Sequence, residues 1–166
     1  MMQYALILAA IAATILAPAP APALPLQTKP AQVAAAQAKA SVVVLYAYNG
    51  KKGIDSRLPD AVKNKLKEPP FSAYDSYERV EQTDLEFALD KNAEHALPNK
   101  DLLKLKLNSV DKKKYNVRIS IERTRDNKTT EIVGIDAKMK KDELFFVAGP
   151  KYKNGILVLG LRVGPK

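Results

Sequence analysis

Polar residues, several of them basic, alternate with apolar residues along three segments in the second half of the chain. This is the period of a β-strand, in which every second side chain points to the same face of the sheet. If the three segments form neighbouring antiparallel strands, one outward face carries Lys104, Lys106, Arg118, Lys138 and Lys140. A turn at the edge of that face would carry Lys112, Lys113 and Lys114. The pattern predicts a surface for a polyanion: an acidic glycan, lipopolysaccharide or nucleic acid.

The same alternation has a simpler interpretation, because the solvated face of any sheet has to be polar. The charge is nevertheless uneven along the chain. Residues 99–166 hold seventeen basic and eight acidic side chains, whereas residues 54–98 hold six basic and ten acidic ones. The outward positions lack the aromatic rings that single-strand nucleic-acid binders use for stacking. Both interpretations of the basic face remain open at this point.

A second candidate is the aromatic cluster of Phe71, Tyr74 and Tyr77, which follows Pro69-Pro70. If exposed, it would form a recognition ledge for a glycan or peptide, since tyrosine combines a flat apolar ring with a polar edge. The alternative is that Phe71 and one tyrosine close the gap between a helix end and a sheet.

Residues suited to catalysis are scarce. The chain has no cysteine and one histidine, His95, which excludes thiol nucleophiles, Cys-ligated zinc and sites with several histidines. No serine lies in a G-x-S-x-G motif. Asp84 and Glu86 would share one strand face, and we interpret them as surface residues. We therefore expect no enzymatic activity, no cofactor and no metal.

Short alternating segments, joined by polar turns, predict the elements that position these residues. One amphipathic helix of about ten residues is indicated by Leu58, Val62 and Leu66, with Ser56 as its N-cap. Strands are predicted at 42–48, 74–82, 85–89, 103–107, 115–121, 133–139, 145–147 and 156–163, with a loop at 149–155. The expected fold is mainly β: an antiparallel β-sandwich or open barrel with one short helix.

Three regions follow from composition. Residues 1–23 have an uncharged apolar run and an Ala-x-Ala pattern at Ala21–Ala23, which indicate a signal peptide. Residues 24–40 are rich in proline and alanine and are typical of a linker. Residues 41–166 form the predicted β-rich domain. We expect a periplasmic or secreted protein with no membrane span in its mature form.

Several turns and core segments resemble small exported proteins of unassigned function from Gram-negative bacteria, myxobacteria-like lineages in particular. The similarity lies in Ile54-Asp55, Pro70 to Tyr77, Leu97-Pro98-Asn99, Val147 to Pro150 and Gly155 to Leu159. It covers most of residues 42–163. The resemblance implies export and a β-rich domain, and it implies no activity or ligand.

The sequence thus leads to an exported, non-enzymatic binding or structural module of the periplasm or cell envelope. Its partner is not identified by the sequence, and the candidates are an envelope protein and an anionic polymer. The alternative is a polyanion-binding protein that uses the basic C-terminal strands. A third alternative is an envelope hydrolase.

Overall fold

Two mainly antiparallel sheets dominate the computed structural model, which describes residues 37–89, 91–112 and 114–166. Sheet A has the order β2 (Gly53–Ile54), β3 (Ser76–Ala88), β1 (Gln37–Tyr48), β9 (Gly155–Pro165) and β8 (Leu144–Tyr152). Sheet B has the order β4 (Ala93–Ala96), β5 (Leu102–Asp111), β6 (Lys114–Arg125) and β7 (Lys128–Lys140). The remaining elements are helix α1 (Asp60–Leu66) and the 3-10 turn η1 (Phe71–Ala73). The predicted mainly β fold with one short helix is confirmed.

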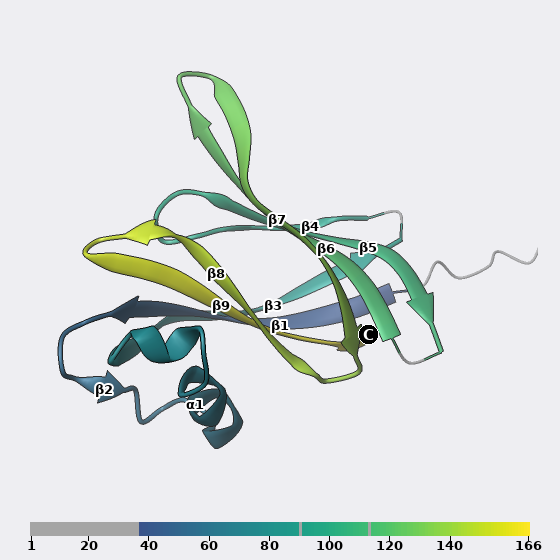
Figure 1. Ribbon diagram of the computed structural model, residues 1–166. Coiled ribbons are helices and arrows are strands. Elements are labelled where there is room, and N and C mark those ends of the chain that lie inside the picture. Colours follow the sequence, from purple (N-terminus) through teal and green to yellow (C-terminus); the bar gives the residue numbers. More distant parts are fainter. Residues whose placement is uncertain (1–36, 90, 113) are drawn as a thin grey trace, which may run out of the picture. The chain divides into compact units, whose positions relative to one another are not determined.

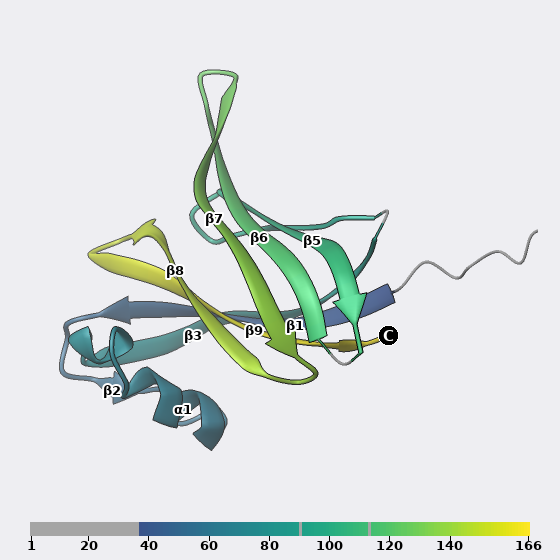
Figure 2. The same ribbon diagram turned by 45° about the vertical axis from the view of Figure 1, so that its right-hand side comes forward.

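The two sheets and the helix form three layers (Figure 1 and Figure 2). Sheet B covers one face of sheet A, and α1 with η1 lies against the opposite face. We call the face of each sheet that points away from the other sheet its outer face. The β6–β7 hairpin extends beyond the layers and leaves its tip in solvent.

The space between the sheets is filled by alternate residues of every long strand. Val42 and Val44 of β1 and Ile119 and Ile121 of β6 are fully buried in this core. Burial of one such side chain contributes about 1.5 to 3 kcal/mol. The apolar residues that recur at every second position in the sequence are therefore the residues through which the two sheets contact each other.

A second core joins α1 to the outer face of sheet A. Leu58, Val62 and Leu66 are buried there against Leu45 and Val158, as the spacing of these three residues predicted. The helix is shorter than predicted, however, and Ser56 is not its N-cap. Pro59 holds that position with an extended backbone (ψ 148°), so helical geometry begins only at Asp60.

The folded region starts earlier than the predicted boundary at Ser41, because β1 already begins at Gln37. Ala38 and Ala40 are fully buried between the sheets. Alanine carries no strand signal, which explains why these positions were assigned to the linker. The predicted signal peptide (1–23) and the linker residues 24–36 lie outside the described residues.

Other boundaries also differ from the prediction. The two strands expected at 74–82 and 85–89 are the single strand β3, and the short strands β2 and β4 were not predicted. The loop expected at 149–155 is mostly strand, because β8 continues through a bulge to Tyr152. Among the described residues, no helix has the length and apolar character needed to cross a membrane.

Candidate polyanion-binding surface

The outer face of sheet B carries the five basic residues that the alternation assigned to one face. In the strand register Lys106 lies opposite Arg118, Asn116 opposite Lys138, and Lys114 opposite Lys140. The residues between them point into the core, as the full burial of Leu105 and Val117 shows. The structure therefore brings together Lys104, Lys106, Arg118, Lys138 and Lys140.

Lys104 is held by acidic neighbours. Its Nζ lies 2.9 Å from Oε2 of Glu122 and 3.4 Å from Oε1 of Glu94. The hydrogen bond to Glu122 is the main cause that raises the pKa of Lys104. Its charge is thus already balanced by carboxylates on the same face.

Arg118 is neutralised in the same way. Its Nη1 lies 2.8 Å from Oδ2 of Asp136, and its Nη2 lies 2.8 Å from Oε1 of Glu131. The hydrogen bond to Asp136 is the largest cause that raises the pKa of the guanidinium. In the half of the face nearest the hairpin, Lys104 and Arg118 are therefore neutralised by ion pairs, whereas Lys106 is exposed and has no ion-pair partner among the described residues.

The opposite end of the same face has a different character. Lys112, Lys114, Lys138 and Lys140, which we call the lysine cluster, are exposed, and within the described residues none has an acidic group at ion-pair distance. Three of them line an open hollow of about 620 Å³ together with Asp111 and Lys141. Lys113, the remaining predicted lysine, lies outside the described residues. The excess of positive charge is thus concentrated at the end formed by the β5–β6 and β7–β8 turns.

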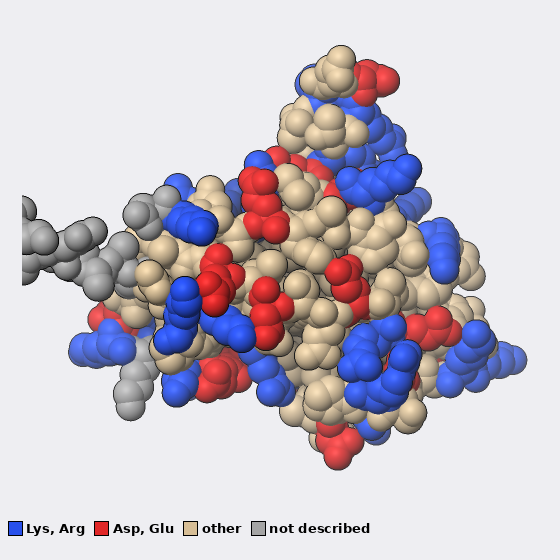
Figure 3. Space-filling view, turned by 180° about the vertical axis from the view of Figure 1, so that it is seen from behind, with Lys and Arg blue, Asp and Glu red and all other residues tan. Residues whose placement is uncertain are grey.

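The hairpin between β6 and β7 adds further basic groups. Its two-residue turn, Asp126-Asn127, has positive φ angles of 50° and 58°, which suit the twist of paired strands. Arg125 and Lys128 flank this turn and are exposed. In the view of Figure 3, basic side chains follow the hairpin at the top, and charges of both signs are interspersed over the rest of that face.

The predicted aromatic ledge is not formed by all three of its residues. Tyr77 is only 1% exposed, and its hydroxyl donates a hydrogen bond to the backbone oxygen of Phe71. Burial raises the pKa of Tyr77 to about 12. Phe71 packs 5.4 Å from the ring of Phe146, and Tyr74 meets Tyr77 edge-on at 6.4 Å. These rings hold η1 against sheet A because its outer face is apolar there.

A second aromatic group was not recognised in the sequence. Tyr46 and Tyr48 stack with ring centres 4.5 Å apart, and Tyr152 meets Tyr46 edge-on at 5.4 Å. The Nζ of Lys153 lies 5.2 Å from the centre of the Tyr152 ring. The sequence feature that could have identified this group is the i, i+2 spacing of Tyr46 and Tyr48, which puts both rings on one face of β1. Their exposed fractions of 6% and 8% leave no open ring for stacking.

The single histidine lies on the short edge strand β4. Its Nε2 is 2.9 Å from Oε1 of Glu81 on sheet A, although the contact lacks hydrogen-bond geometry. The acid pair Asp84 and Glu86 does share a strand face, and each carboxylate binds a lysine. The described residues contain no group of three or more His, Asp or Glu side chains suited to hold a metal ion.

Comparisons with models of protein families, with curated proteins and with solved structures give no match for this chain. The arrangement of charge on sheet B is therefore the basis on which a function is proposed.

Proposed function

We propose that the chain is an exported, non-enzymatic binding module of the periplasm or cell envelope, and that it binds an acidic glycan through the lysine cluster. The observation that carries the proposal is the position of Lys114 directly opposite Lys140. Asp111 lies opposite Lys114 on the other neighbouring strand, but among the described residues no carboxylate is at ion-pair distance from either ammonium group. Like charges directly opposite each other destabilise a sheet. A polyanion bound across both strands would remove this repulsion.

The contrast within sheet B supports a ligand at this end. Lys104 and Arg118 on the same face each bind two carboxylates. The lysine cluster has none within the described residues, so its ammonium groups are free to bind anions from solution. Neighbouring strands lie about 4.8 Å apart, and residues i and i+2 of a strand about 7 Å apart. A polymer with closely spaced charges engages several of these lysines at once, whereas a small anion engages one or two.

The side chains around the cluster favour a glycan over a single-stranded nucleic acid. The outward positions of β5, β6 and β7 hold no aromatic residue, and the nearby ring of Tyr115 is buried. Single-strand binders gain much of their affinity from bases stacked on exposed rings. A sulfated or carboxylated glycan needs only cations at suitable spacing.

Chromatography on immobilised heparin, a sulfated glycan, tests the proposal. The triple variant Lys114→Gln, Lys138→Gln, Lys140→Gln should elute at a much lower salt concentration than the unmodified protein. The control is Lys67→Gln, Lys91→Gln, Lys151→Gln, which removes the same charge from exposed lysines elsewhere. Equal elution of the two variants would show that binding follows net charge alone, and the proposal would be rejected.

A further inference from the structure

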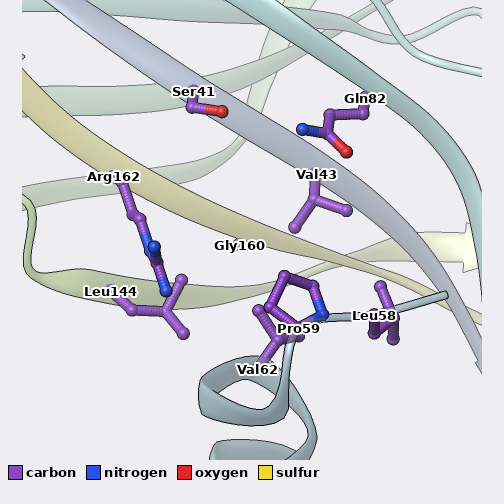
Figure 4. A pocket seen from close by; sticks show the side chains of 9 residues that line it. All are labelled: Ser41, Val43, Leu58, Pro59, Val62, Gln82, Leu144, Gly160 and Arg162. Atoms are coloured by element: carbon purple, nitrogen blue, oxygen red, sulfur yellow. The ribbon is translucent and has the colours of Figure 1, made fainter. Parts of the chain in front are cut away.

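A cavity of about 90 Å³ lies between α1 and the outer face of sheet A (Figure 4). The lysine cluster lies on the outer face of sheet B, on the opposite side of the fold. Its walls are mostly apolar and come from the helix region and from three strands. These residues are Leu58, Pro59, Val62, Val43, Leu144 and Gly160. Ser41, Gln82 and Arg162 complete the lining and make one side of the cavity polar.

The backbone of Gly160 forms the floor of the cavity, and the cavity remains unfilled there because glycine has no side chain. Gly160 lies between Val43 of β1 and Phe146 of β8 in the sheet register. A Cβ atom at this position would lie 2.8 Å from Cγ1 of Val43 and 2.9 Å from Cε1 of Phe146. Only glycine fits here without displacing its neighbours. The helix-side residues Leu58, Pro59 and Val62 line the cavity across from it.

Arg162 provides the one positive charge in the cavity lining. It lies directly opposite Leu144 in the β8–β9 register, and Figure 4 shows its guanidinium beside the Leu144 side chain. Within the described residues it has no ion-pair partner.

Two acids line a second hollow together with Arg162, and each has a lysine partner of its own. This hollow, lined by Asp84 and Asp142, shares Ser41 and Arg162 with the cavity. The Nζ of Lys39 lies 2.9 Å from Asp84, and the Nζ of Lys141 lies 3.9 Å from Asp142. The guanidinium is therefore a half-buried cation, next to an apolar cavity, without an anion.

We infer that this cavity binds an aliphatic carboxylate, with the carboxylate on Arg162 and the hydrocarbon chain between α1 and sheet A. A guanidinium and a carboxylate form two parallel charge-assisted hydrogen bonds. A cavity of about 90 Å³ suits a short branched hydrocarbon chain. The chemistry is that of a free branched-chain acid or of a polypeptide ending in leucine. The site lies on sheet A and does not depend on the proposed glycan surface.

Titration with 4-methylpentanoate, followed by the NMR signals of the Val43, Val62 and Leu144 methyl groups, tests the site. This acid has the carboxylate and side chain of leucine without the amino group. We expect saturable shifts at these methyls, and at least tenfold weaker binding of 4-methylpentanamide, which lacks the charge, and of acetate, which lacks the chain. A peptide with a free C-terminal leucine, compared with its amidated form, shows whether a polypeptide terminus binds more tightly than the free acid.

The variant Arg162→Gln should lose at least tenfold in affinity for 4-methylpentanoate. Arg125→Gln, an exposed arginine on the hairpin of sheet B, is the matched control and should bind as the unmodified protein does. Arg162→Gln should also keep its retention on heparin, which separates this site from the lysine cluster. Equal binding of the acid and the amide, or no shift of the three methyl groups with 4-methylpentanoate in large excess over the protein, would overturn the inference.

Discussion

Lys114 and Lys140 lie directly opposite each other on the outer face of sheet B, on the adjacent strands β6 and β7. Neither ammonium group has a carboxylate within ion-pair distance among the described residues. Cross-strand pairs of like charge lower the stability of a sheet. A pair of this kind is unfavourable for folding alone and favourable for binding an anion.

The repulsion can be measured. Lys140→Gln should raise the free energy of unfolding by about 0.2 to 1 kcal/mol, and the gain should shrink in high salt because screening already weakens the repulsion. Urea denaturation at low and high ionic strength provides the values. Lys151→Gln is the control, since Lys151 lies opposite Ile156 and should change stability by less than about 0.5 kcal/mol. A loss of stability in Lys140→Gln would show that the lysine has an unrecognised stabilising contact.

Tyr77 is expected to act in folding and not in recognition. Its hydroxyl donates to the backbone oxygen of Phe71, which also accepts a hydrogen bond from the backbone N–H of Tyr74. Tyr77→Phe removes one of these two hydrogen bonds and should cost about 1 kcal/mol. Tyr74→Phe is the control, because Tyr74 is only half-buried and meets Tyr77 through its ring. Urea denaturation checks the stability, and heparin retention should be unchanged in both variants. Lost retention in Tyr77→Phe at full stability would restore the ledge hypothesis.

The ion pair of Asp101 and Arg123 predicts a pH dependence of stability. Oxygens Oδ1 and Oδ2 of Asp101 accept hydrogen bonds of 2.8 Å and 2.6 Å from Arg123, and the Asp101 side chain is 4% exposed. The guanidinium holds the pKa of Asp101 below its ordinary value. The pair therefore stabilises the fold above the unfolded-state pKa of about 3.9, and this contribution is lost as the pH falls through the lower folded-state pKa.

Asp101→Asn removes this contribution. At pH 7 the variant should be less stable than the unmodified protein by about 1 to 3 kcal/mol, and the difference should narrow below about pH 4. Asp126→Asn, at the exposed hairpin tip, is the control and should follow the unmodified protein. Urea denaturation between pH 7 and pH 2.5 measures both curves. A difference that stays constant over this range would exclude the ion pair as its source.

The alternation of polar with apolar residues was sufficient to predict that the basic side chains of β5, β6 and β7 lie on one outer face. Strict alternation would place Glu131 on the core side of β7, because Glu131 lies two residues before Val133, which packs against the core. This prediction fails. A bulge between Ile121 and Glu122 shifts the register, so that Glu131 lies opposite Glu122 on the outer face. This is how Arg118 gains a carboxylate that the sequence pattern places on the other side.

The sequence pattern could not predict short elements or contacts between residues far apart in the chain. β4 has four residues, too few to show a period. The cavity beside Arg162 is formed by Pro59, Gly160 and other residues far apart in the chain, so no local spacing indicates it. The helix residues Leu58, Val62 and Leu66 were predicted because their contacts follow a local 3.6-residue period.

The salt dependence of heparin binding tests the proposed glycan surface most directly. Each lysine that contacts the polyanion releases about one counterion, so the slope of log K against log salt concentration reports the number of contacts. Replacing Lys114, Lys138 and Lys140 by glutamine should reduce the steepness of this slope by about three. The control variant at Lys67, Lys91 and Lys151 should keep the slope of the unmodified protein. Slopes that fall equally in the two variants, or in neither, would contradict a binding surface at the lysine cluster.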